Sequence, residues 1–177
     1  MLYRVSGMVD LEGLSFLEEL PLRELLAHWI FLEGDKALLY EKLAEKARGM
    51  EVEGAVGDMF KLLGQEARRH EKKLRTLYTR KFGAEIPEVH GPSLEELSDI
   101  RELESENDVF AVLKCALELE EVAERVYSIL AEKADDETLR AIFSYLASTE
   151  RLHERAVESL LRDYDYRNGM GKERMEA

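Results

Sequence analysis

Two glutamates begin the same short motif in two distant parts of this sequence. Glu33 precedes Tyr40 by seven residues, and Glu120 precedes Tyr127 by the same interval. The second pair follows the first at a constant offset of 87 residues (120 − 33 and 127 − 40). Seven residues make nearly two turns of an α-helix, so each tyrosine shares the helix face of its glutamate. Because a phenol can hold a metal-binding carboxylate of a facing helix in orientation, the repeated motif is a candidate for metal chemistry.

Each motif is followed, in the next stretch of sequence, by a histidine. His70 follows the first, and Glu150 with His153 follows the second. Residues at i and i+3 lie on adjoining parts of one helix face, so Glu150 and His153 can reach the same metal. Burying Glu33, Glu120 and Glu150 in one core is unfavourable unless these carboxylates are paired or bind cations. We therefore expect the three glutamates and two histidines to form a metal site inside a helix bundle.

Four long amphipathic segments position these side chains. Apolar residues recur at steps of three and four, and no segment alternates with period two. The expected helices cover residues 21–48, 56–82, about 107–134 and 137–162. Pro21 suits a first helical turn, Gly49 and Gly83 follow helix ends, and Asp135-Asp136 forms a break and N-cap. Ser105 or Asn107 is expected to cap the third long helix.

The connector between the second and third long helices is longer than a tight turn. It contains Pro87 and Pro92, and Ser93-Leu-Glu-Glu96 is a capping-box start for a short helix of about ten residues. The predicted fold is all-α, a four-helix bundle with a long crossover that contains a short helix. Residues 21–162 are expected to form the bundle of a single domain, 1–177. Residues 1–20, where Gly7 and Gly13 should break any helix, and 163–177 are expected to be peripheral or flexible.

Composition limits the classes of partner. The chain has 177 residues, one cysteine and a net charge of −13. That charge argues against nucleic acid, and the lone Cys115 excludes an intramolecular disulfide and a cysteine-ligated cluster. No apolar run is long enough for a membrane span, and the first residues lack a secretory apolar region, so we expect a cytoplasmic protein. Many charged residues and few amides are typical of hyperthermophile proteins.

The joint pattern resembles the ferritin-like di-iron carboxylate proteins, and among them the rubrerythrin-like branch. In that branch each helix pair supplies Glu, a small residue at +3, Tyr at +7 and Ala at +11, and then Glu-x-x-His. The second half of this sequence matches throughout. Its matching residues are Glu120, Ala123, Tyr127, Ala131, Glu150 and His153. The first half matches at Glu33, Tyr40, Ala44 and His70.

Two positions depart from that pattern. Ala67 stands three residues before His70, where the branch has a ligand glutamate. Glu66, brought round by a π-bulge near residues 66–70, or Glu124 is a candidate replacement. Lys36 stands three residues after Glu33, where the other half has Ala123. Its ammonium either snorkels outward or occupies cation space beside Glu33, which would suit a single divalent ion. We expect two metals.

The resemblance implies a di-iron protein that reduces hydrogen peroxide or dioxygen, or oxidises ferrous iron, in oxidative-stress defence. The ligands would be Glu33, His70, Glu120, Glu150 and His153, with Tyr40 and Tyr127 orienting carboxylates. Manganese or zinc is also compatible with these donors. Electrons would come from an external donor such as a separate rubredoxin-like protein, and a homodimer is expected. The alternatives are an iron-storage module, or a structural bundle whose site holds one metal or none. His28 and His90 are interpreted as structural or exposed.

Overall fold

Six helices form the described part of the chain, which is residues 11–49, 54–83, 85–97 and 109–175 of the computed structural model. They are α1 (Leu11–Glu19), α2 (Leu22–Gly49), α3 (Gly54–Phe82), α4 (Leu94–Leu97), α5 (Val109–Lys133) and α6 (Glu137–Met175). Within these ranges there is no strand, so the all-α prediction is confirmed.

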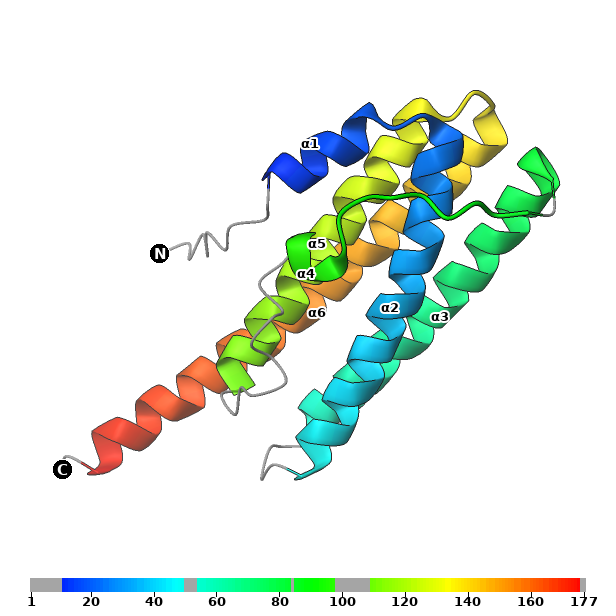
Figure 1. Ribbon diagram of the computed structural model, residues 1–177. Helices are drawn as coiled ribbons and strands as arrows, with labels where there is room; N and C mark the ends of the chain where they lie inside the picture. The colour runs from blue at the N-terminus through cyan, green and yellow to red at the C-terminus, as the bar shows by residue number, and fades with distance from the viewer. Residues whose placement is uncertain (1–10, 50–53, 84, 98–108, 176–177) are drawn as a thin grey trace.

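The four long helices form two antiparallel hairpins, α2 with α3 and α5 with α6, which pack side by side (Figure 1). The connector after α3 runs back across α2 and leads to α4, which lies beside α5 (Figure 1). This long crossover lets the second hairpin begin at the end of the bundle opposite the one where α3 finishes. The arrangement is the predicted ferritin-like four-helix bundle.

Local chemistry sets the helix ends as expected. Gly83, directly after α3, has φ +108°, a conformation in which glycine carries no side-chain penalty. Asp136 caps α6, since its Oδ1 accepts a hydrogen bond from the Leu139 amide at 2.8 Å. In the capping box of α4, the Ser93 amide donates to Glu96 Oε2 at 2.8 Å.

The crossover is fastened to the first hairpin through His28 of α2, which is buried. The His28 ring nitrogens lie 3.2 Å from the Val89 carbonyl oxygen and 3.0 Å from that of Pro92. A Cβ on Gly91 would come within 2.9 Å of the same ring, so a glycine permits this close approach. His28 is therefore structural, whereas His90 is exposed.

One helix was not expected, and another extends further than expected. α1 passes through Gly13 without a break, and Leu17 on it is fully buried in the core. α6 continues to Met175, well beyond residue 162. The expected contributions of Gly7, Ser105 and Asn107 fall outside the described residues, as does any continuation of α4 beyond Leu97. No helix in the described ranges combines the length and the apolar character that a membrane span requires.

Aromatic rings fill the middle of the bundle on both sides of the predicted site. Trp29 meets Tyr127 edge-on with ring centres 6.1 Å apart, and Tyr40 stacks on Phe60 at the same separation. All four rings are at most 1% exposed. The Trp29–Tyr127 contact joins the two hairpins, whereas the Tyr40–Phe60 contact lies within the first hairpin.

Candidate metal centre

The structure brings the five predicted Glu and His ligands together between the hairpins. Glu33 comes from α2, His70 from α3, Glu120 from α5, and Glu150 with His153 from α6. The three glutamates are at most 1% exposed, and both histidines lie against them. Four helices therefore place acidic and imidazole groups in one buried pocket.

Within the pocket the donors form two groups that share Glu150. In the first, Glu33, His70 and Glu150 each offer an atom within 4.8 Å of the other two. In the second, Glu120, Glu150 and His153 do the same. Glu150 uses Oε1 toward His70, at 2.8 Å from Nδ1, and Oε2 toward His153, at 3.2 Å from Nδ1. A carboxylate that faces two donor groups through separate oxygens can bridge two cations.

The two tyrosines hold glutamates of the opposite hairpin. The Tyr127 hydroxyl on α5 donates to Glu33 Oε1 at 2.7 Å, and the Tyr40 hydroxyl on α2 donates to Glu120 Oε1. Burial, and then the neighbouring carboxylate, raises the pKa of each phenol well above its ordinary value. Both tyrosines thus stay protonated and orient a carboxylate, as the seven-residue spacing predicts.

Lys36 points into the pocket rather than outward. Its side chain is 3% exposed, and Nζ lies 3.6 Å from Glu33 Oε1, 3.7 Å from Glu120 Oε2 and 3.5 Å from Glu150 Oε2. Burial by itself would lower the pKa of Lys36, but these three carboxylates raise it above its ordinary value. The folded protein thus favours the charged form of Lys36 inside the candidate metal centre.

The comparisons with known proteins agree with this architecture. The model of the rubrerythrin family matches residues 111–176. A solved structure of a hypothetical protein from Pyrococcus furiosus is 31% identical, with a TM-score of 0.70 over 85% of this chain and 94% of that one. No curated protein matches significantly. Residues 111–176 thus form a rubrerythrin domain. The chain is a ferritin-like protein whose buried Glu and His residues suit a non-haem metal site.

The candidate replacement ligands of this chain lie outside the pocket. Glu66 pairs with Arg69 on the surface, and α3 runs through residues 66–70 as regular α-helix without a π-bulge. Glu124 accepts from Ser128 at 3.1 Å and from Arg151 Nε at 2.8 Å. Neither belongs to a donor group among the described residues. In this structure an arginine holds each carboxylate away from the position of Ala67, and the replacement of the missing glutamate by either one stays a prediction.

Several buried donor atoms show that the pocket suits a cation. Among the described residues, Glu33 Oε2, His70 Nδ1 and Glu150 Oε1 have no hydrogen-bond partner. The 2.8 Å contact of His70 Nδ1 with Glu150 Oε1 lacks hydrogen-bond alignment. Ligands about 2.1 Å from one ion and at right angles around it lie roughly 3 Å apart, close to this separation. The first donor group therefore fits a metal ion.

Proton affinities in the pocket reflect burial and the position of Lys36. Burial raises the pKa of Glu120 to about 7 and also raises that of Glu33, although Lys36 opposes both shifts. Burial would raise the pKa of Glu150 as well, but Lys36 and hydrogen bonds from its neighbours hold it well below its ordinary value. Burial lowers the pKa of His153, yet hydrogen bonds to Glu120 and Glu150 raise it to about 9.

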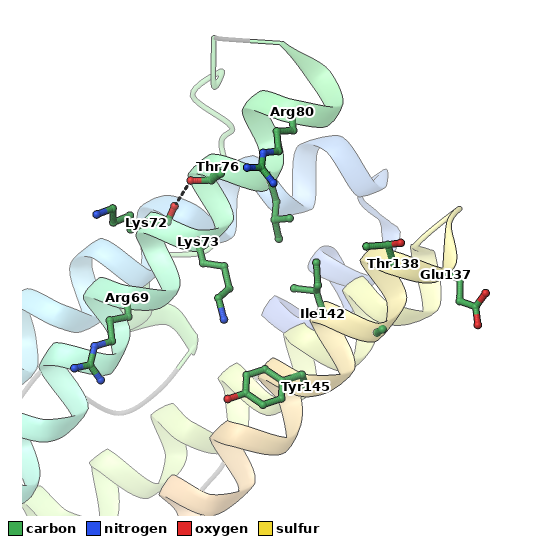
Figure 2. A pocket seen from close by; sticks show the side chains of 11 residues that line it. Arg69, Lys72, Lys73, Thr76, Arg80, Glu137, Thr138, Ile142 and Tyr145 are labelled. Carbon is green, nitrogen blue, oxygen red and sulfur yellow. Dashed lines mark hydrogen bonds between the residues drawn. The ribbon is translucent and has the colours of Figure 1, made fainter.

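A separate hollow lies between α3 and α6 (Figure 2). Basic side chains of α3, including Lys73 and Arg80, face Ile142 and Tyr145 of α6 across it (Figure 2). Lys73 Nζ lies 5.2 Å from the centre of the Tyr145 ring. None of the buried Glu and His donors lines this hollow, so it is distinct from the candidate metal centre.

Proposed function

We propose that this chain binds iron in the buried Glu and His pocket and reduces hydrogen peroxide or dioxygen there. One observation carries the proposal: three unpartnered buried donor atoms belong to Glu33, His70 and Glu150, whose ligand atoms come within 4.8 Å of one another. Leaving such atoms buried without partners is unfavourable, and a bound cation satisfies all three together. Iron is the family's metal, and when bound it supplies electrons to a small oxidant.

The chain's own residues would prepare the pocket for that chemistry. Tyr127 fixes Glu33 from the opposite hairpin, so this carboxylate is oriented before any ligand arrives. The rings of Trp29 and Phe60 line the surrounding core and exclude bulk water. His153, which is 13% exposed, is the most accessible of the five donors. A small molecule such as peroxide is therefore proposed to approach from its side.

The electrons are proposed to come from a separate donor protein. Cys115, the only cysteine of the sequence, is buried, and one cysteine does not make a cysteine-ligated iron centre. Turnover then requires docking of an external reductant, and a dimer is proposed as the functional form. Without such a donor, the protein would oxidise iron only stoichiometrically.

The proposal is tested by loading the protein with ferrous iron without oxygen and then adding peroxide and a reduced dye. Peroxide-dependent oxidation of the dye, with a new near-ultraviolet absorbance of the protein, is the expected result. Glu150→Gln is the matched variant, because it removes the carboxylate shared by both donor groups. The proposal is wrong if the wild-type protein consumes peroxide no faster than this variant.

A second candidate, a metal-free structural bundle, is favoured by one observation. The Lys36 ammonium already lies among all three buried carboxylates. If it compensates them fully, the purified protein holds far less than one metal per chain, and chelators leave its melting temperature unchanged. Metal content and a thermal melt with and without chelator separate this candidate from the main proposal.

A further inference from the structure

We propose that the pocket holds a single divalent cation, bound by Glu33, His70 and Glu150, and that the Lys36 ammonium takes the place of a second one. This inference rests on the proposed metal binding. It adds where the ion binds, how many bind, and which side chain excludes the other. Three independent features of the pocket support it.

The first feature is that the two donor groups differ in how well their atoms are satisfied. Every unpartnered buried carboxylate or imidazole atom among the described residues, namely Glu33 Oε2, His70 Nδ1 and Glu150 Oε1, belongs to the first group. In the second group, His153 Nδ1 lies within 3.2 Å of both Glu120 Oε2 and Glu150 Oε2. The first group thus keeps donor atoms for a cation, and the second is closed by its own contacts.

The second feature is the position of the ammonium. Lys36 Nζ lies 3.7 Å from Glu120 Oε2 and 3.5 Å from Glu150 Oε2, the same two oxygens that face His153. A divalent ion bound to those oxygens would lie next to a fixed positive charge of like sign. The repulsion is strong because the pocket is buried and poorly screened. The Lys36 ammonium thus blocks a metal position at the second donor group, both by its charge and by the space that it occupies.

The third feature is the charge of the pocket. Three carboxylates, one ammonium and one divalent cation sum to zero when both imidazoles are uncharged, and to +1 when His153 is protonated. A second divalent ion would leave at least two uncompensated positive charges in a buried site, which is unfavourable. Charge neutrality therefore selects one ion.

The internal duplication shows how the sequence reaches this state. Lys36 occupies the position that Ala123 has in the other half, three residues after the motif glutamate. Ala67 occupies the position that Glu150 has, three residues before the histidine. Together the two differences remove one negative charge and add one positive charge. That change equals the charge of one divalent ion.

The test is a metal titration of the full chain after chelator treatment, with Co(II) as the probe. Bound cobalt is counted after desalting, and its visible spectrum reports the ligand set. The wild type is expected to hold about one ion per chain, since one ion neutralises the pocket. His70→Ala should lose that ion, whereas His153→Ala should keep it. Lys36→Met should gain a second ion, and Lys61→Met, an exposed control on α3, should match the wild type.

The outcomes distinguish this inference from the proposed function. About two ions in the wild type would overturn the inference and leave metal binding intact. Loss of the ion in His153→Ala with retention in His70→Ala would overturn the assigned position. No ion in a folded wild type would overturn both proposals. If Lys36→Met folds only when cobalt is present, that dependence supports the inference, and the two histidine variants decide the position independently.

Discussion

The two hairpins of this bundle carry the same motif but surround different environments. In the second hairpin, Glu120, Glu150 and His153 contact one another and the ammonium of Lys36. In the first, Glu33 Oε1 contacts Lys36 and Tyr127, but Glu33 Oε2 and His70 Nδ1 have no hydrogen-bond partner. A duplicated sequence has thus produced one self-neutralised side and one side open to a cation.

The difference arises from only two positions, and neither changes the fold. Ala67 and Lys36 are both buried and both sit within regular helix. A lysine with an aliphatic stem packs in the core like an apolar residue as long as its ammonium reaches carboxylates. The lesson is that the chemistry of a bundle site is set by charges supplied from opposite helices, while the backbone stays the same.

The largest expected effect comes from replacing Glu150, the residue that belongs to both donor groups. In metal-free protein, Glu150→Gln should lower the free energy of unfolding by about 3 kcal/mol or more, because Lys36 loses a buried partner. The lowered pKa of Glu150 means that the folded state favours its charged form. Urea unfolding in the presence of chelator measures the change.

The matched control for that variant is Glu154→Gln on the same helix. Burial and neighbouring carboxylates raise the pKa of Glu154 to about 7, so the folded state disfavours its charge. Removing this charge should leave stability unchanged or slightly higher at neutral pH. Equal destabilisation by both variants would contradict the assigned importance of the Glu150–Lys36 contact.

The difference between the two halves can also be tested by giving the first half the residues that the second half has at the equivalent positions. The double variant Lys36→Ala/Ala67→Glu removes the ammonium and restores the missing carboxylate, so it should bind about two divalent ions per chain, as di-metal bundles do. Excess metal should then raise its stability by about 3 kcal/mol per ion at a hundredfold excess over Kd. Cobalt counting and thermal melts give the two readouts.

Ala67→Glu alone is the control for the double variant. It should still bind about one ion, because Lys36 continues to occupy the second position and repels a further cation. If the single variant already binds two ions, the ammonium does not block the site. The carboxylate count alone would then explain the difference between the halves.

A smaller effect is expected from the two tyrosines, which form a matched pair across the pocket. Tyr127→Phe frees Glu33, a ligand of the proposed ion, and should weaken Co(II) binding by about 10- to 100-fold. Tyr40→Phe frees Glu120, which is not a proposed ligand, and should leave the affinity nearly unchanged. Calorimetric titration of both variants measures the difference, and equal weakening would place Glu120 among the ligands.

Sequence reasoning captured what depends on local chemistry. The helix ends at Gly49, Gly83 and Asp136 follow from backbone conformation and capping, and the structure confirms them. The shared face of Glu33 and Tyr40 follows from helical periodicity alone. In contrast, α1 was missed because the burial of Leu17 depends on tertiary packing that a nine-residue segment does not reveal.

The direction of the Lys36 side chain could not be predicted from the sequence, for a related reason. An outward and an inward rotamer are both compatible with its helix position, and the choice depends on Glu120 and Glu150, which are more than 80 residues away in the chain. Glu66 shows the opposite case. An offset of one residue turns it about 100° around the helix, away from His70, and the regular geometry of α3 keeps it there.

The smallest expected effects test whether the outer carboxylates take any part in the metal centre. Glu66→Gln and Glu124→Gln each remove one partner of a surface ion pair with Arg69 or Arg151. Exposed pairs contribute about 1 kcal/mol or less, so stability should hardly change, and the cobalt count should stay at the wild-type value. Glu66 lies close in sequence to His70, and Glu124 lies close to Glu120, so a loss of cobalt in either variant would show that its glutamate turns inward when metal binds. The open first half would then recruit a fourth carboxylate, and the charge argument for a single ion would fail.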